Sequence, residues 1–233
     1  MTTSLCIIPA RGGSKRIPRK NILPLNGIPL LAYSIRAAKE SNVFQDIIVS
    51  TEDEEIKALA LSEGVEVDDR PTHMAGDRVT KVQVVKEYLE RKKAYEKYEN
   101  IAALLPTCPF RTANDVKSAV ELFNNQSSYK YLIGVVEYDF PIQLALEYTD
   151  KNKVKMISAD SYETTRSQNI AKRYHPNGAI YLATMDAFRA NGTFFNEQML
   201  AYEMPAVRSY DIDYPYQFEI AEIMAKKIAN GEL

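Results

Sequence analysis

The chain has 233 residues, a length that suits one α/β domain. Apolar residues make up 45% and charged residues 26%, with a formal net charge of -2, so the composition excludes a disordered chain. The same balance gives no sign of a nucleic-acid-binding surface or of an electrostatic membrane anchor. No apolar run approaches the roughly 18 residues of a membrane-spanning helix, and the first 11 residues lack the pattern of a signal peptide.

The cysteine and histidine content narrows the class of protein further. Cys6 and Cys108 are the only cysteines, and both lie in apolar stretches of the sequence. Two such cysteines do not make a disulfide framework. We therefore expect a cytoplasmic protein. The two histidines, His73 and His175, are too few for a His-based metal site.

Strand and helix patterns alternate through the first 136 residues. Short apolar runs predict strands at 5–9, 46–50, 65–67, 101–105 and 131–136. Helices are predicted between them at 30–39, 53–63, 81–98 and 116–123, the last capped by Thr112 and Asp115. This order predicts an α/β fold: a mostly parallel, Rossmann-like sheet flanked by helices.

The alternation of strand and helix patterns stops between residues 140 and 175. Short β-like pieces, the turn at 150–152 and a polar stretch predict an arm that leaves the sheet. A strand at 177–182 then returns, and a helix at 216–229 closes the chain. The expected organisation is a single domain over 1–233 with an inserted arm over 140–175.

A basic, glycine-containing loop follows the first strand. Residues 11–20 hold five cations and no acid, where an even spread of 29 over 233 residues would place about one. Gly12 and Gly13 allow the backbone to approach a ligand, and the carboxyl end of a strand is where open α/β sheets bind ligands. The loop is neither a Walker A motif nor a dinucleotide fingerprint, and it predicts a triphosphate site; the alternative is an exposed basic turn.

Asp211 and Asp213 form a second motif, shortly before the last helix. In an extended segment, residues two apart point to the same side, with Ile212 turned toward the core. Two carboxylates facing one way suit Mg²⁺, which binds one or two of them together with substrate phosphate oxygens. The alternative is a solvated strand end.

At these motifs the sequence resembles the acylneuraminate cytidylyltransferases, which include the CMP-sialic acid synthetases and their bacterial legionaminic and pseudaminic relatives. The resemblance implies a nucleotidyltransferase that converts CTP and an acidic nine-carbon sugar into a CMP-sugar and pyrophosphate. It also implies that the arm mediates formation of a homodimer. The matching stretches run in order along the chain: 8–15, 20–21, 49–53, 70–71, 106–111, 176–181 and 211–213.

The resemblance implies roles for individual residues. Arg11, Lys15, Asp211 and Asp213 would serve catalysis, and the two aspartates would hold Mg²⁺, for which Mn²⁺ can substitute. The implied nucleotide contacts are Arg11, Gly12, Gly13, Ser14, Lys15, Lys20, Asn21, Arg70 and Thr80. The implied sugar contacts are Gln143, Arg166, Gln168, Arg173, Asn177, Tyr181, Phe194 and Phe195.

Three positions depart from the family pattern and leave the sugar open. Leu105 stands where the sialic-acid branch often has Gln, and Gln217 stands where the family often has an acid. The Arg-Gln pair of the arm becomes Arg166-Ser167-Gln168. Two alternatives to a CMP-nonulosonate synthetase remain: a CMP-Kdo-type or other sugar nucleotidyltransferase on the same fold, and a non-catalytic nucleotide-binding regulator.

Overall fold

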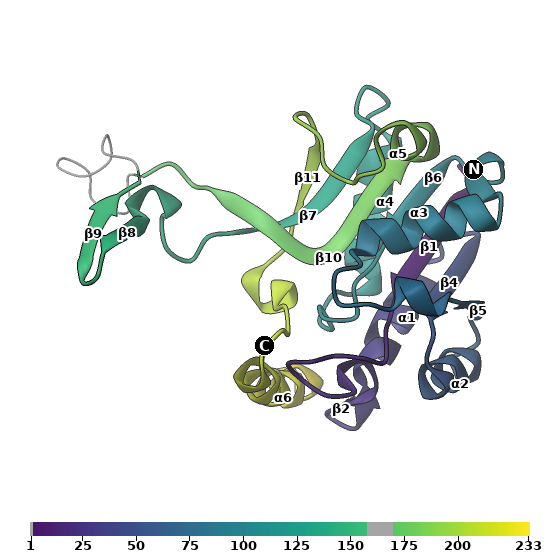
Figure 1. Ribbon diagram of the computed structural model, residues 1–233, viewed down its shortest axis with the longest axis horizontal. Helices are drawn as coiled ribbons and strands as arrows, with labels where there is room; N and C mark the ends of the chain where they lie inside the picture. The colour runs from purple at the N-terminus through teal and green to yellow at the C-terminus, as the bar shows by residue number, and fades with distance from the viewer. Residues whose placement is uncertain (1, 158–169) are drawn as a thin grey trace.

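A seven-stranded sheet forms the centre of the computed structural model, which describes residues 2–157 and 170–233 (Figure 1). The strand order is β11-β7-β10-β6-β1-β4-β5, and β10 alone runs antiparallel to its neighbours. The predicted mostly parallel sheet is confirmed. Its strands are β1 (Ser4–Pro9), β4 (Asp46–Thr51), β5 (Glu66–Asp69), β6 (Asn100–Ala103), β7 (Tyr131–Glu137), β10 (Tyr174–Thr184) and β11 (Leu200–Glu203).

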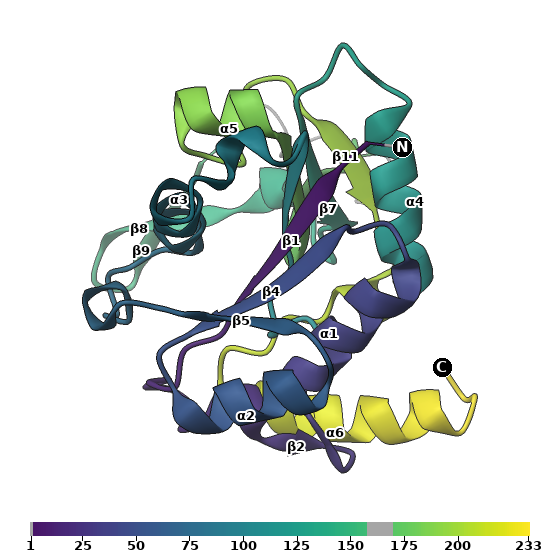
Figure 2. The ribbon, with the colours of Figure 1, turned by 90° about the vertical axis from the view of Figure 1, so that its right-hand side faces the viewer.

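Helices cover both faces of the sheet (Figure 2). One face packs against α1 (Leu30–Ser41), α2 (Glu54–Ser62) and α4 (Ala113–Asn124), and the other against α3 (Lys81–Arg91) and α5 (Met185–Asn191). Successive side chains of β1 alternate between the two cores, Cys6 and Ile8 on the first face, Leu5 and Ile7 on the second. This double burial explains why the strand is apolar throughout.

A third, smaller apolar cluster lies below the sheet. There α6 (Pro215–Ala229) packs near the short hairpin of β2 (Pro24–Leu25) and β3 (Ile28–Pro29), around Leu25, Phe110 and Ala221. Ile212 is fully buried in this cluster, so its predicted inward orientation is confirmed. Its burial anchors the segment that carries Asp211 and Asp213.

Side-chain caps determine where two helices begin. Thr112 Oγ1 accepts the Asp115 N–H at 3.1 Å and Asp115 Oδ2 accepts the Thr112 N–H at 2.9 Å, which is the predicted capping box of α4. Asp53 Oδ1 accepts the N–H groups of Glu55 and Ile56 at 3.1 and 3.0 Å and so caps α2. Both caps satisfy backbone donors that the first helical turn leaves free.

Several predicted boundaries were wrong. The helix predicted over 81–98 ends at Arg91, because Lys93 adopts a left-handed conformation (φ 52°) and a short 3₁₀ turn, Ala94–Glu96, follows. Strand β10 is longer than the strand predicted at 177–182. Neither α5 nor β11 was predicted: each has only a few residues, and β11 alternates half-buried with exposed positions at the sheet edge.

The chain leaves the sheet after β7 and returns at β10. Between them, β8 (Leu146–Asp150) and β9 (Lys153–Met156) form a hairpin that stands away from the body (Figure 1). The predicted turn at 150–152 joins these strands, with Asn152 in the left-handed region (φ 65°). The positions predicted in the arm at Arg166 and Gln168 lie outside the described residues.

The carboxyl ends of the parallel strands meet at one edge of the sheet. Pro9 pairs with Ser50, and Ser50 with Asp68, so the loops after β1, β4 and β5 emerge side by side. Because β10 runs the opposite way, its first half reaches this same edge. Open α/β sheets bind their ligands at such an edge.

Candidate active site

A cavity of about 200 Å³ opens at this edge. Five of the predicted nucleotide-binding residues line it, together with Lys81, Leu105 and Thr107. A larger hollow of about 440 Å³ lies near α3 and α5, but it contains none of the predicted site residues. We therefore assign the site by its chemistry. The predicted residues on the cavity wall are Arg11, Ser14, Lys20, Asn21 and Arg70.

The backbone of the basic loop is held by side chains. Asn21, itself buried, donates from Nδ2 to the Arg11 carbonyl at 2.9 Å, and Glu52 Oε1 accepts the Gly12 N–H at 2.8 Å. A Cβ on Gly12 would overlap the Asp53 carboxylate, whereas one on Gly13 would meet no atom within 4 Å. The steric need for glycine within the protein therefore lies at Gly12.

Asp77 pairs with two cations in the first part of the loop. Arg11 Nη1 lies 3.0 Å from Asp77 Oδ1, and Lys15 pairs with the other oxygen, Oδ2. Hydrogen bonding from Lys15 holds the pKa of Asp77 below its usual range. One carboxylate therefore bridges the two cations predicted to hold phosphate.

The remaining loop cations also have acidic partners. Arg16 and Lys20 approach Asp213 at 3.3 and 3.2 Å, and Lys20 Nζ donates to the Ile212 carbonyl at 2.7 Å. Arg19 pairs with Asp53, farther along the same edge. Every cation of the loop thus meets a carboxylate that a phosphate would have to replace or share.

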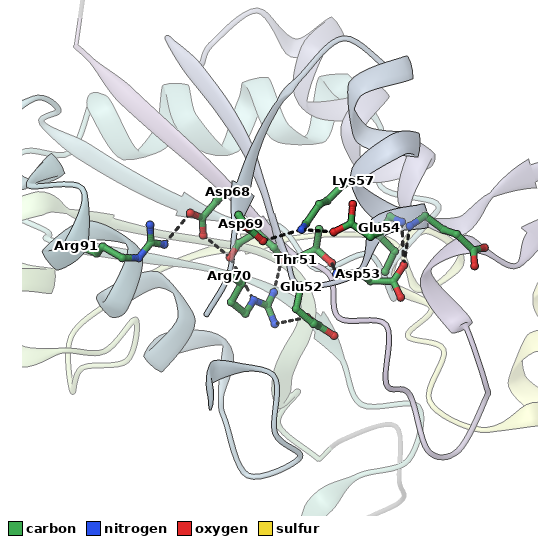
Figure 3. Close-up of polar contacts among 12 residues, drawn as sticks. Thr51, Glu52, Asp53, Glu54, Lys57, Asp68, Asp69, Arg70 and Arg91 are labelled. Atoms are coloured by element: carbon green, nitrogen blue, oxygen red, sulfur yellow. Dashed lines mark hydrogen bonds and ion pairs between the residues drawn. The ribbon is translucent and has the colours of Figure 1, made fainter. Parts of the chain in front are cut away.

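Arg70 is buried and firmly held (Figure 3). Its Nε donates to Ser50 Oγ at 3.2 Å, and Nη1 lies 3.9 Å from Glu52 Oε2. Ser50 in turn donates to Asp68 at 2.9 Å, and Arg91 donates to the other oxygen of Asp68 at 2.7 Å. Burial lowers the pKa of Arg70, but an arginine stays protonated. The network therefore presents a fixed positive charge to the cavity.

Thr80 caps helix α3 rather than lining the cavity. Its hydroxyl accepts the Gln83 N–H at 3.3 Å, and its own N–H donates to the Gln83 side chain at 2.8 Å. Its two neighbours, Val79 and Lys81, both reach the cavity wall. Thr80 thus orients the start of α3 next to the site.

Asp211 and Asp213 have different surroundings. Asp211 is the more enclosed: burial raises the pKa of its carboxyl, opposed by a hydrogen bond from Thr107, and Oδ1 has no hydrogen-bond partner within the described ranges. Asp213 is 48% exposed and takes Lys20 and Arg16 as partners. A buried acceptor without a donor is costly, and a cation beside it would remove that cost.

The predicted aromatic residues gather beside the cavity. Tyr181 on β10 lies 5.9 Å from Phe194 and 6.0 Å from Phe195 between ring centroids. Phe194 is fully buried and packs on Phe188, whereas Phe195 is 42% exposed. Only Phe195 therefore offers a ring face of any size to a ligand, with Phe194 supporting Tyr181 from behind.

Among the described residues, the other predicted sugar contacts, Gln143, Arg173 and Asn177, do not line this cavity. Asn177 is buried, and its side chain serves the protein: Nδ2 donates to Ser209 Oγ at 3.0 Å and Oδ1 accepts the Ala179 N–H at 3.0 Å. Gln143 donates to the Ala171 carbonyl at 2.7 Å, and Arg173 lines a separate hollow at the base of the arm.

Three residues of the site had no predicted role. Glu52 holds Gly12, Asp77 bridges Arg11 and Lys15, and Lys81 lines the cavity. Glu52 stands directly after a predicted strand, so its position at the ligand-binding edge was a usable signal. Asp77 and Lys81 lie in or next to an irregular stretch, where no periodicity shows which way a side chain points.

This sheet, with its basic loop and a carboxylate pair at one edge, is the framework of a nucleotidyltransferase. The chain belongs to the cytidylyltransferase family, whose sequence model, described as Cytidylyltransferase, matches residues 5–227. The predicted family resemblance and the predicted enzyme class are confirmed.

Curated relatives match over nearly the whole chain. A pseudaminic acid cytidylyltransferase of Campylobacter jejuni (strain 81-176) is 37% identical over 96% of both chains. The CMP-N,N'-diacetyllegionaminic acid synthase of Campylobacter jejuni (strain NCTC 11168) is 33% identical over 96% of this chain and 95% of its own. An N-acylneuraminate cytidylyltransferase of Escherichia coli is 35% identical, and the chain spans 53% of its length.

Solved structures share the fold. A CMP:2-keto-3-deoxy-manno-octonic acid synthetase complexed with CTP superposes with a TM-score of 0.71 at 15% identity, covering 97% of this chain and 100% of the other. A 4-diphosphocytidyl-2C-methyl-D-erythritol synthase from Anaerococcus prevotii gives 0.67 at 13% identity, covering 97% and 99%. In the described part of the chain, no helix is long and apolar enough to cross a membrane.

Proposed function

We propose that this cytidylyltransferase activates an acidic nine-carbon sugar, a nonulosonic acid of the sialic, legionaminic or pseudaminic type. CTP and the sugar acid give the CMP-sugar and pyrophosphate. The observation that carries the proposal is the composition of one cavity: phosphate-binding cations line it, and Lys81 on its wall contacts the rings of Tyr181 and Phe195. Relatives named for all three sugar types, 33–37% identical, support the same substrate class.

The reaction needs little covalent chemistry from the protein. The anomeric hydroxyl of the sugar attacks the α-phosphorus in line: a P–O bond forms, the bond to pyrophosphate breaks, and the hydroxyl proton is released to solvent. Arg11 and Lys15 hold the β- and γ-phosphates in place of Asp77, and Ser14, Lys20, Asn21 and the fixed charge of Arg70 complete the nucleotide contacts. Positioning and charge stabilisation then account for the rate.

Asp211 and Asp213 fit a hard divalent cation. The buried Oδ1 of Asp211 lacks a hydrogen-bond donor, and the pair offers oxygen ligands only. Residues 2–157 and 170–233 contain no group of three or more His, Cys, Asp or Glu side chains placed to hold a metal, so water and substrate phosphate oxygens would complete the shell. Mg²⁺, with Mn²⁺ as a substitute, stabilises the negative charge that develops on the α-phosphate and leaving group when it is bound.

A second copy of the chain completes this proposal. The hairpin and the chain leading to it expose apolar side chains: Phe140 at 66%, Leu146 at 56%, Tyr148 at 80% and Ile157 at 64%. A two-stranded hairpin is marginally stable alone in water, so a partner surface is expected to cover it. We place this arm, residues 140–175 of a single domain spanning 1–233, at the interface of a homodimer.

The arm also explains the dispersed sugar contacts. Gln143 and Arg173 lie at its base, away from the cavity of their own subunit, and Arg166 and Gln168 belong to the same insertion. A two-fold dimer brings such residues to the cavity of the other subunit. Sedimentation of a concentration-independent, fully active monomer would contradict this arrangement.

The two cysteines support the proposed cytoplasmic location. Cys6 and Cys108 are both buried free thiols, and burial raises the pKa of each. Such inert reduced thiols are in keeping with the proposed cytoplasmic location.

One experiment tests the function directly. Pyrophosphate release is measured with CTP, UTP, GTP and ATP against sialic, legionaminic and pseudaminic acids and Kdo. Turnover with CTP and one of the nine-carbon acids is expected. Turnover with Kdo alone would show the octonate-activating alternative, and tight CTP binding without turnover on any sugar would show a regulator.

A further inference from the structure

Lys81 is the one cation on the cavity wall without an acidic partner among the described residues. Four cations line the cavity, and three of them, Arg11, Lys20 and Arg70, have a carboxylate within 4.0 Å. Lys81 has neither an ion pair nor a hydrogen bond there, and the Asp211 charge reaches it only from farther away. The other three cations are therefore each paired with a carboxylate of the protein, and Lys81 is not.

The surroundings of Lys81 make this unpaired charge costly. Its ammonium lies 4.1 Å from the centroid of the Tyr181 ring and 5.9 Å from that of Phe195. Burial lowers the pKa of Lys81, since aromatic faces replace part of its water. It is also the first residue of α3, where the helix dipole disfavours a positive charge. An anion supplied by a ligand would offset both the burial and the unfavourable helix dipole.

The position of Lys81 indicates which ligand supplies that anion. Arg11, Lys20 and Arg70, the other cations on the cavity wall, are the ones that the proposed function assigns to the triphosphate. Lys81 instead contacts the aromatic pair Tyr181 and Phe195, where the sugar is expected, and neighbouring Leu105 on the cavity wall offers no polar side chain. The anionic group of a nonulosonic acid is its carboxylate.

We propose that Lys81 binds the carboxylate of the acidic sugar and so selects acid sugars over neutral ones. The inference rests on the proposed function, since it requires that an acid sugar is the acceptor. Lys81 leaves its place over Tyr181 by rotation of its flexible side chain, and the vacated ring face becomes available to the sugar.

The test compares Lys81→Ala, Lys81→Gln and Lys81→Arg with wild type in two measurements. Steady-state kinetics give the KM for the sugar acid and for CTP, and calorimetry gives the Kd for CTP. Loss of a charge-assisted contact predicts a rise of roughly 10- to 100-fold in the KM for the sugar acid in the Ala and Gln variants. The Kd for CTP should stay within about twofold, and Lys81→Arg should recover part of the loss.

A matched control and a modified substrate make the test specific. Lys86→Ala removes a lysine from the same helix, where it pairs with Glu90 at 3.8 Å outside the cavity, and should leave both KM values unchanged. The methyl ester of the sugar acid lacks the carboxylate charge. Wild type should discriminate against the ester, and Lys81→Ala should discriminate far less.

The contrary outcomes are distinct. An unchanged KM for the sugar acid in Lys81→Ala overturns the proposal, as does an equal loss of CTP affinity, which would assign Lys81 to the nucleotide. A lower melting temperature with unchanged kinetics would show a purely structural lysine. Failure of the proposed function is recognised separately, because the wild-type protein would then bind CTP but turn over no acid sugar, and the assignment of Lys81 would fall with it.

Discussion

Arg11 and Asp77 lie 66 residues apart in the chain, and their side chains meet at 3.0 Å. The second oxygen of Asp77 pairs with Lys15. The carboxylate therefore occupies the two cations that the proposed reaction assigns to the β- and γ-phosphates. A bound triphosphate therefore has to compete with the Asp77 carboxylate for Arg11 and Lys15.

Asp77→Asn should tighten CTP binding. The substitution keeps the shape of the side chain but removes the charge that competes with phosphate, so the Kd for CTP should fall about 3- to 10-fold, as expected for a partly exposed ion pair. Calorimetric titration with CTP measures the change. Asp69→Asn is the control, since Asp69 pairs with Lys57 outside the cavity and its loss should leave the Kd unchanged. Weaker CTP binding in Asp77→Asn would mean that Asp77 organises the loop for the nucleotide.

The two glycines of the loop should respond differently to substitution. Gly12→Ala places a methyl group on the Asp53 carboxylate, which cannot retreat freely because it also caps α2 and pairs with Arg19. We expect a lower melting temperature and CTP binding weakened by roughly 10-fold or more.

Gly13→Val is the informative partner of that variant. A Cβ at Gly13 meets no protein atom within 4 Å, so the melting temperature should stay unchanged, while CTP binding should weaken because the branched side chain blocks approach of the phosphates. Thermal unfolding and CTP titration of both variants check these expectations. Normal CTP kinetics in both variants would show that the loop does not bind the triphosphate.

Asp211→Asn and Asp213→Asn should lower turnover far more than CTP affinity. Each removes one negative charge from the proposed cation site, where charge develops in the transition state, so kcat should fall roughly 100-fold or more. Titration with Mg²⁺ should partly restore the activity of these variants but not that of Lys15→Ala. At neutral pH, Asp211→Asn should not lower the melting temperature, because burial raises the pKa of this carboxyl and the charged form is the costly one. Unchanged turnover in both variants would show that Asp211 and Asp213 hold no catalytic cation and only form a solvated strand end.

Asp115 should contribute to the free energy of unfolding at neutral pH, and this contribution should be lost at acidic pH. The carboxylate is fully buried and accepts from Arg208 Nε and Nη2 at 2.9 and 3.0 Å as well as from Thr112. Burial acts to raise the pKa of Asp115, but these hydrogen bonds outweigh it and hold the pKa below the ordinary value. The contribution is therefore complete above the unfolded pKa of about 3.9 and is lost as the pH falls below it through the folded pKa.

Asp115→Ala should accordingly lower the free energy of unfolding by about 2–3 kcal/mol at pH 7, less than for a wholly buried pair because water can solvate the remaining Arg208. Urea unfolding at pH 7 and at intervals below pH 4 measures both effects, and the variant should lack part of the acid dependence. Glu121→Ala, which breaks the exposed pair with Lys117, should change stability by less than about 0.5 kcal/mol. Equal losses in the two variants would contradict the role given to Asp115.

Local patterns in the sequence predicted the mostly parallel sheet, most of the helices and the two motifs of the candidate site. The capping of α4 by Thr112 and Asp115 spans four residues, and the burial of Ile212 between two aspartates spans three. Such features depend on neighbours in the chain, whose spacing is visible without a fold. The cation-rich loop and its place after the first strand were visible for the same reason.

The tertiary structure alone decided which charges meet. Asp77 returns to Arg11, Glu52 holds Gly12, and Lys81 lies against Tyr181 because strand register and the packing of α3 bring distant segments to one edge. No period in the sequence encodes the direction of a side chain in an irregular stretch such as 70–80. The sequence therefore indicated the two motifs of the candidate site, and the packing of the sheet determined which of their charges are paired within the protein.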